Sequence, residues 1–208
     1  MSVTFNQFIT EARKAQLASK RGRVSKPGNR SGSKEAPKSI MMTGAPGSGK
    51  STLAQGIAKK TGGTRYGYDD ARRDIHGDHT NQGDFPKVHK RTMDTLRTAP
   101  KDKPRIQDNT NVNPKFREKT KTDLKTQADF DEPITSVMPN TSRRAAFRRN
   151  RARGEKQVPH RIMRAMWNQH DKFKKTKDGK AAVQKGRELS KELRIPSKQR
   201  RFRRRTSK

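Results

Sequence analysis

The stretch from Gly44 to Ser51 reads GAPGSGKS, and it constrains the fold more than any other part of the sequence. It matches the pattern G-x-x-x-x-G-K-S, in which glycines let the backbone curl until successive N–H groups point inward at phosphate oxygens. An apolar run at 39–43 precedes the motif, and a segment at 52–58 with leucine and isoleucine on one helical face follows it. Strand, loop and helix in this order predict a phosphate-binding loop (P-loop) between a buried strand and a helix of an α/β protein.

Each part of such a loop has its own role, and ATP with Mg²⁺ is the expected pair of ligands. Lys50 is expected to reach the β- and γ-phosphates, and the hydroxyl of Ser51 is expected to hold Mg²⁺. A chance match within a turn is the alternative, and the flanking strand and helix argue against it. The segment that would wrap the phosphates comprises Gly44, Ala45, Pro46, Gly47, Ser48, Gly49, Lys50, Ser51 and Thr52.

The charge of the chain is strongly positive and unevenly spread. Of 52 Lys and Arg and 20 Asp and Glu, residues 141–208 hold 25 basic and only 5 acidic side chains, whereas residues 41–140 hold 18 and 13. We therefore expect a basic N-terminal arm and linker over 1–38, a folded domain over 39–170 and a polybasic tail over 171–208. Both extensions are expected to be largely disordered, and the tail favours nucleic acid, DNA or RNA, as a partner.

Other classes of protein fit the composition poorly. The chain has no cysteine, which excludes disulfides and thiolate chemistry and allows a reducing cytoplasm. No run of about 18 apolar residues is present, so no membrane span is predicted. The tail also lacks the bulky apolar face of an interfacial helix, and we therefore expect no membrane partner.

The remaining elements alternate between short strands and helices, which is the pattern of a parallel sheet with right-handed crossovers. Asn113 followed by Pro114 has the chemistry of a helix start, with Asn as the cap and Pro in the first helical position. Short apolar runs predict further strands at 64–68, 104–108 and 133–138, and helical patterns predict helices at 1–18, 86–98, 142–154, 158–170 and, as a weaker signal, 181–193.

Two acidic positions follow predicted strands and could carry chemistry. Asp69 and Asp70 come directly after the second strand, where a carboxylate can accept the proton of an attacking hydroxyl and Arg72 can hold an anionic group of the acceptor. Capping of the next helix by one of these aspartates is the alternative. Asp108 follows the third strand and is the candidate for a second metal-side group, accepting from Ser51 or from a Mg²⁺-bound water, although a turn-forming cluster of Asx residues is also possible there.

Six arginines crowd the helix predicted at 142–154. Arg149 and Arg153 are four residues apart and share one face, from which an arginine clamp could stabilise the charge of a transferring phosphoryl group. The other arginines must be solvated or bind a polyanion. The five histidines show no metal-ligand spacing, and we interpret them as surface or substrate-side groups.

Four motifs taken together resemble the kinase domain of phage-type polynucleotide 5′-hydroxyl kinases over about residues 39–170. They are Gly44–Thr52, YDDAR at 68–72, DNTNVNP at 108–114, and RNRARG at 149–154 followed by Val158-Pro159. The resemblance implies a P-loop kinase-like parallel sheet flanked by helices. It also implies that Asp69 is the general base, that Arg72 contacts an acceptor phosphate, and that Arg149 and Arg153 belong to a lid over the ATP phosphates.

Two departures from the family pattern stand out. With Thr110-Asn111 as the anchor, the phage pattern has its acidic residue where Asn109 stands here, whereas related kinases read D-N-T-N as this chain does. A D-x-D-x-T phosphatase signature is also absent from the sequence. We therefore expect a kinase without the accompanying end-healing phosphatase.

The leading hypothesis is an ATP-dependent kinase that phosphorylates the 5′-hydroxyl of a DNA or RNA end, with Asp69, Lys50 and Arg153 as its catalytic residues. One alternative is a small-molecule P-loop kinase that acts on a nucleotide or sugar. Another is a nucleic-acid-binding phage virion protein with a vestigial kinase core. Residues 5–12 resemble the openings of proteins from large tailed phages, so the expected location is the cytoplasm, that of the host if phage-encoded, with association with the virion as a further possibility.

Overall fold

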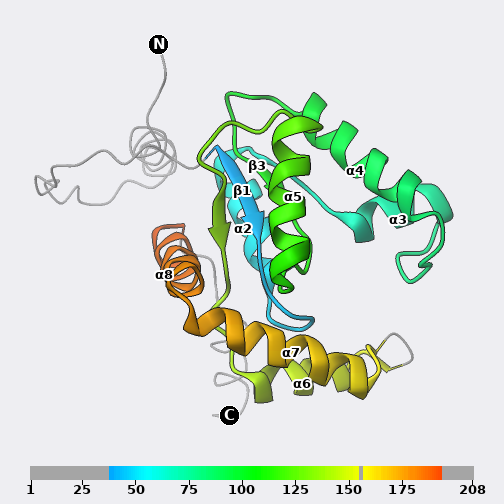
Figure 1. The fold of residues 1–208 in the computed structure, drawn as a ribbon, viewed down its shortest axis with the longest axis vertical. Coiled ribbons are helices and arrows are strands. Elements are labelled where there is room, and N and C mark those ends of the chain that lie inside the picture. Colours follow the sequence, from blue (N-terminus) through cyan, green and yellow to red (C-terminus); the bar gives the residue numbers. More distant parts are fainter. Residues whose placement is uncertain (1–37, 155–156, 194–208) are drawn as a thin grey trace, which may run out of the picture.

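A four-stranded parallel sheet forms the centre of the molecule in the computed structural model, which describes residues 38–154 and 157–193 (Figure 1). The strand order is β2-β3-β1-β4, so the strand before the P-loop lies inside the sheet between β3 and β4. Ile40 of β1 is in register with Ile106 of β3 and with Thr135 of β4. The parallel α/β sheet predicted from the sequence is confirmed. The strands are β1 (Ser39–Met42), β2 (Thr64–Tyr66), β3 (Arg105–Gln107) and β4 (Thr135–Val137).

Helices connect and cover the strands, and most begin where the sequence predicts. The side chain of Asn113 accepts hydrogen bonds from the N–H groups of Lys115 and Phe116, and Ser142 caps the next helix through the N–H of Ala145. Both caps fix helices that border the functional site. The helices are α2 (Lys50–Thr61), α3 (Tyr68–His76), α4 (Phe85–Thr98), α5 (Pro114–Thr126), α6 (Arg143–Arg151), α7 (His160–Lys175) and α8 (Lys177–Glu192).

Alternate residues of β1 build two separate layers of core, because side chains of a strand point to opposite faces. One layer packs Ile40 and Met42 against α2 and α8. The other packs Met41 against α4 and α5. Helices therefore cover both faces of the sheet, as a parallel sheet with crossover helices requires. Across residues 38–154 and 157–193, no helix has both the length and the apolar character of a membrane span.

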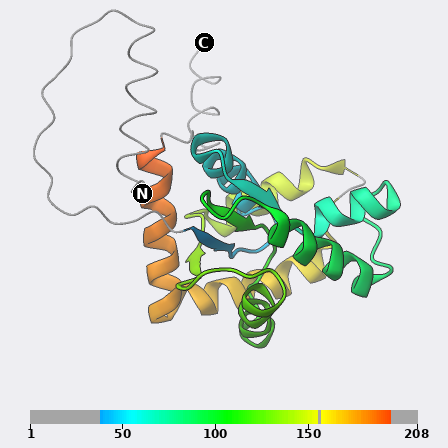
Figure 2. The ribbon, with the colours of Figure 1, turned by 90° about the horizontal axis from the view of Figure 1, so that it is seen from above.

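The expected domain boundary at residue 170 is wrong, because the fold continues through two further stretches of helix. α7 runs on to Lys175, and α8 buries Leu189 and Leu193 in the same core layer as Ile40. The Met138 N–H donates to the Ala182 carbonyl at 3.0 Å, which ties α8 to the end of β4. Figure 2 shows α8 at one side of the sheet and α3 and α4 at the opposite side.

Charge patterning explains the misplaced boundary. Basic side chains outnumber acidic ones at 171–193, but Ala182, Val183 and Leu189 form a buried stripe beneath the basic side chains. Gly186 lies in this stripe, and a Cβ there would meet the Met138 carbonyl at 2.2 Å, so only glycine permits this close packing. The folded domain therefore extends to 193. The N-terminal arm, for which the sequence predicts a helix at 1–18, and the last part of the tail, 194–208, lie outside the described residues.

Candidate active site

The P-loop follows β1 directly and reaches the N-terminus of α2 through two left-handed glycines. Gly47 has φ of 75° and Gly49 has φ of 93°, a region in which residues with a Cβ are strained. A Cβ on Gly47 would also lie 2.8 Å from the Ala146 carbonyl oxygen of α6. The Gly44 N–H donates to the Thr110 carbonyl at 2.8 Å, which anchors the start of the loop to the segment after β3. The predicted strand, loop and helix are thus confirmed.

Helices α6 and α7 lie across the end of the sheet that carries the P-loop (Figure 1) and hold the loop from outside. Trp167 of α7 donates from Nε1 to the Pro46 carbonyl at 3.1 Å. Arg149 of α6 donates to the Gly47 carbonyl at 2.9 Å, and Thr141 donates to the Ser48 carbonyl at 2.6 Å. These contacts occupy carbonyl oxygens that would otherwise repel phosphate, so they favour anion binding at the loop.

His170 also contacts the loop, and the sequence-based interpretation of it as a surface or substrate-side group is wrong. Its ring is fully buried beside Trp167, and Nδ1 accepts the Ala45 N–H at 3.2 Å. Burial, and secondly the charge of Lys174, lower the pKa of His170 to about 4. A protonated Nδ1 could not accept the Ala45 N–H, so the loop contact requires the neutral imidazole.

A cleft of about 510 Å³, which we call the phosphate cleft, lies in front of the loop, where the phosphates of a nucleotide would bind. Arg149 is half-buried there, and burial together with the neighbouring charge of Arg148 lowers the pKa of its guanidinium. Arg153 also lines this cleft, but α6 ends at Arg151, so Arg153 reaches it from the turn after the helix and not from a shared helical face. The lining residues are Gly47, Gly49, Lys50, Ser51, Thr52, Gln55, Arg149, Ala152 and Arg153.

A second cleft, also of about 510 Å³, opens between the P-loop, α3 and the segment that follows β3. It contains Asp69, Arg72 and Asp108, so the structure brings the three acceptor-side and metal-side candidates together. Lys50 lines this cleft as well as the phosphate cleft. The two clefts therefore share the side chain that, in a P-loop, contacts the phosphate to be transferred.

The two aspartates after β2 have different roles. Asp70 accepts the Gly67 N–H at 3.0 Å and caps α3, as the alternative interpretation proposed for one of the pair. Asp69 faces the cleft with its side chain 65% exposed and forms an ion pair with Arg72 at 3.0 Å. The Arg72 side chain is only 12% exposed, and its Nε is buried without a hydrogen-bond partner. Asp69 therefore presents a largely exposed carboxylate to the cleft, and Arg72 holds one of its oxygens.

Asp108 is held by Arg65, a residue that the sequence analysis did not single out. Its Oδ2 accepts from Arg65 Nε at 2.9 Å and from Nη2 at 2.7 Å. Burial alone would lower the pKa of the Arg65 guanidinium, but Asp108 and then Asp70 raise it, so the arginine stays charged. Only spatial neighbours reveal this pairing, because Arg65 lies on β2 and has no motif around it.

Two residues of the site, Ser51 and Asp108, have the chemistry to hold Mg²⁺. Asp108 Oδ1 is buried without a hydrogen-bond partner in a cleft that Lys50 also lines, and such an oxygen suits a metal-bound water. Ser51 lies at the start of α2 in the phosphate cleft. No group of three or more His, Asp or Glu gathers as a metal cage in the described part of the chain. A Mg²⁺ held here would take its other ligands from phosphates and water, as Mg²⁺ usually does.

Comparison with solved structures identifies a similar fold. Among solved structures, a chain of the "Structure of the Pnkp1/Rnl/Hen1 RNA repair complex" superposes with a TM-score of 0.54 at 21% sequence identity. The match covers 64% of this chain and 43% of that chain, so the present protein spans less than half the length of its structural neighbour. No curated protein sequence matches significantly. The fold is thus that of a P-loop kinase-like domain.

A family model described as "AAA domain" matches residues 40–175, from β1 and the P-loop to the end of α7. This segment contains both clefts and all the contacts that hold the loop, and it makes up more than half of the 208 residues. The chain therefore belongs to the AAA domain family, as one of its nucleotide-binding P-loop members.

Proposed function

We propose that this protein is an ATP-dependent kinase that transfers the γ-phosphate to the 5′-hydroxyl of a DNA or RNA end. One observation carries the proposal: Lys50 lines both the phosphate cleft and the cleft that holds Asp69 and Arg72. A donor and an acceptor bound in the two clefts would meet at this lysine. That is the arrangement that phosphoryl transfer requires, because the attacking and leaving oxygens must approach the same phosphorus in line.

In the proposed reaction, the acceptor oxygen forms a bond to the γ-phosphorus while the bond from that phosphorus to the β–γ bridging oxygen breaks. Asp69 accepts the proton of the attacking hydroxyl, and ADP carries away the electron pair of the broken bond. Lys50 and the arginines at 149 and 153 stabilise the negative charge on the transferring group. When bound, Mg²⁺ would neutralise charge on the β- and γ-phosphates. Ser51 and Asp108 are the protein groups that would hold it, directly or through water.

Two features support a polynucleotide acceptor. The cationic guanidinium of Arg72 lines the cleft beside Asp69, which suits a phosphate adjacent to the terminal hydroxyl. Exposed basic side chains also continue over α6 and α7 outside the clefts, where they can contact further phosphates. They include Arg144, Arg151, Arg161, Arg164 and Lys172. The structural neighbour belongs to an RNA repair complex, which is consistent with this substrate class.

The test is transfer from γ-labelled ATP to a panel of acceptors with the full chain. The panel contains 5′-hydroxyl DNA and RNA oligonucleotides, mononucleosides, nucleotides and simple sugars. We expect label on the oligonucleotides, with loss of both ATP binding and transfer in Lys50→Ala. Label on small molecules alone would replace the proposal with a small-molecule kinase. Absence of transfer to every acceptor, with nucleic acid still bound, would support a nucleic-acid-binding protein with a vestigial core.

A further inference from the structure

Large apolar side chains line the second cleft, which contains Asp69 and Arg72 and which we call the acceptor cleft. Among the described residues, the exposed large hydrophobic side chains are Ile75, Phe85, Phe116 and Ile162. Both phenylalanines line the cleft that holds Asp69, whereas neither isoleucine does. We propose that Phe85 and Phe116 form a stacking site for the base of the acceptor nucleotide that bears the 5′-hydroxyl. This inference rests on the proposed kinase function and specifies what its acceptor site recognises.

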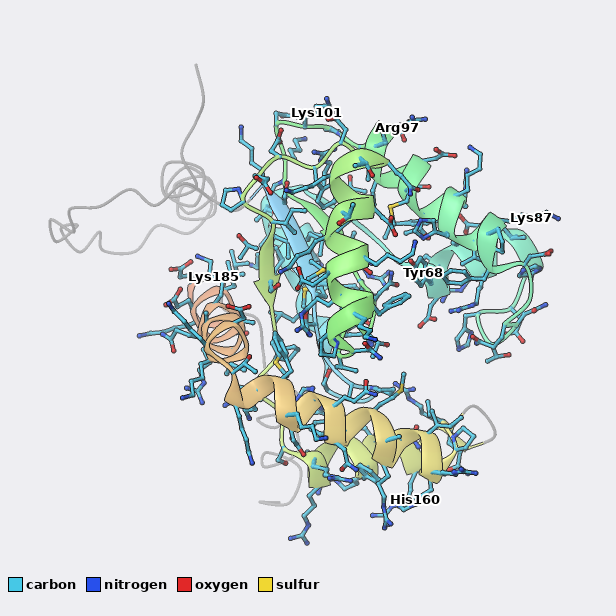
Figure 3. All side chains as sticks on the ribbon, viewed as in Figure 1. Tyr68, Lys87, Arg97, Lys101, His160 and Lys185 are labelled. Atoms are coloured by element: carbon cyan, nitrogen blue, oxygen red, sulfur yellow. The ribbon has the colours of Figure 1, made fainter. Side chains whose placement is uncertain are left out.

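Phe85 is held in place from behind while its outer surface stays open. Its ring packs edge-to-face on Tyr68, with centroids 5.4 Å apart, and lies 6.0 Å from the ring of His89. The Tyr68 hydroxyl is hydrogen-bonded to His89 Nδ1 at 2.9 Å, which fixes the supporting pair. Figure 3 shows Tyr68 between α5 and the helices α3 and α4. Phe85 nevertheless remains 44% exposed among the described residues, so part of an aromatic surface is positioned in advance and is open.

Phe116 reaches the same cleft from α5. Asn113 caps this helix by accepting the Phe116 N–H, so the cap fixes the backbone from which the ring projects. The side chain remains 38% exposed although it is large and apolar. Asn113 itself lines the cleft, together with the amide side chains of Gln82 and Gln169. These amides can hydrogen-bond to the edge of a planar ring system, whereas the phenylalanines can contact its faces.

The chemistry of the cleft selects a nucleotide over other occupants. Arg72 and Lys50 favour an anionic group near Asp69, and the phenylalanines favour a flat apolar group in the same cleft. A 5′-terminal nucleotide has a hydroxyl, a nearby phosphodiester and a base, and so matches all three features. A sugar has no flat apolar surface of this size, so it would leave both phenylalanines exposed to water. A volume of about 510 Å³ is within the range of cavities that hold ligands of this size.

The test compares two 5′-hydroxyl oligonucleotides of equal length, one with a normal terminal base and one with an abasic terminal nucleotide. Stacking of one base on aromatic side chains corresponds to roughly 5- to 150-fold in affinity. We expect the wild type to show a KM for the normal acceptor lower than that for the abasic one by a factor in this range. Phe85→Ala and Phe116→Ala should each reduce this preference, because they should raise the KM for the normal acceptor more than the KM for the abasic one. Phe85→Tyr keeps the aromatic face and should keep the preference.

Ile162→Ala is the matched control, because Ile162 is 49% exposed and lies outside the cleft. A direct measurement uses an oligonucleotide with 2-aminopurine at its 5′ end, whose fluorescence should fall on binding to the wild type and fall less with either Phe→Ala variant. Equal KM values of the wild type for normal and abasic acceptors would refute the base site and leave the kinase proposal standing. If neither acceptor is phosphorylated, the kinase proposal fails and the inference fails with it.

Discussion

Lowering the pH should destabilise this protein through one buried histidine. The His170 imidazole is fully buried, accepts the Ala45 N–H of the P-loop and has a pKa lowered to about 4. In the unfolded chain its pKa is about 6.5. Between these values the unfolded chain binds a proton that the folded chain does not, so the free energy of unfolding falls as the pH falls from about 6.5 to about 4.

The size of this effect follows from the shift. A difference of about 2.5 units between the two pKa values corresponds to about 3 kcal/mol when the full window is crossed, of which about 2 kcal/mol is lost by pH 5. A domain of this size has a total stability on the order of 5–15 kcal/mol. The loss is therefore large enough to measure by urea unfolding at a series of pH values between 4.5 and 7.5.

Because other groups titrate in the same range, the informative quantity is the difference between variants. His170→Gln keeps an oxygen acceptor for the Ala45 N–H but cannot be protonated, so it should lose about 2 kcal/mol less than the wild type between pH 7 and pH 5. His160→Gln is the control, because His160 is exposed on the outer side of α7 (Figure 3) and should follow the wild type. Parallel pH profiles for wild type and His170→Gln would refute this reasoning.

Three further outcomes are expected. Asp69→Asn should reduce transfer by about 10²–10⁴-fold while ATP affinity stays nearly unchanged, because the carboxylate faces the acceptor cleft; wild-type turnover would contradict a general-base role. Arg149→Ala and Arg153→Ala should each reduce the transfer rate much more than Arg144→Ala does, whereas equal small losses would identify this region as a polyanion-binding surface only. Truncation after Leu193 should raise the KM for long oligonucleotides and flatten its salt dependence, with a very short acceptor unaffected; unchanged affinity at every salt concentration would assign the tail to another partner.

Local chemistry explains what could be predicted from the sequence. The P-loop and the start of α5 are determined by residues adjacent in the chain: glycines that permit left-handed backbone, and an Asn-Pro pair that starts a helix. The carboxyl ends of parallel strands meet at one edge of a sheet, so Asp69 and Asp108 could be expected in one cleft before their contacts were known.

Contacts between distant segments explain what the sequence could not reveal. Arg65 pairs with Asp108, 43 residues later, and His170 contacts the P-loop across 125 residues. No local pattern marks either partner. The helix around Val183 was underestimated for a different reason: an abundance of Lys and Arg was interpreted as a tail, although long basic side chains can border a narrow buried stripe. A high net charge indicates which partners a segment can bind, but it does not exclude that the segment forms a packed helix.

The two arginines that we expect to cover the ATP phosphates, Arg149 and Arg153, differ in their contacts. Arg149 already donates to the Gly47 carbonyl and is half-buried, so it stabilises the loop before any nucleotide is present. Arg153 is exposed in the following turn and lines the same cleft. A phosphate bound beside Arg149 would place a negative charge next to a poorly solvated cation, and it would therefore raise the lowered pKa of Arg149. We therefore expect the loss of Arg149 to affect both the loop and a bound phosphate, and the loss of Arg153 to affect the phosphate alone.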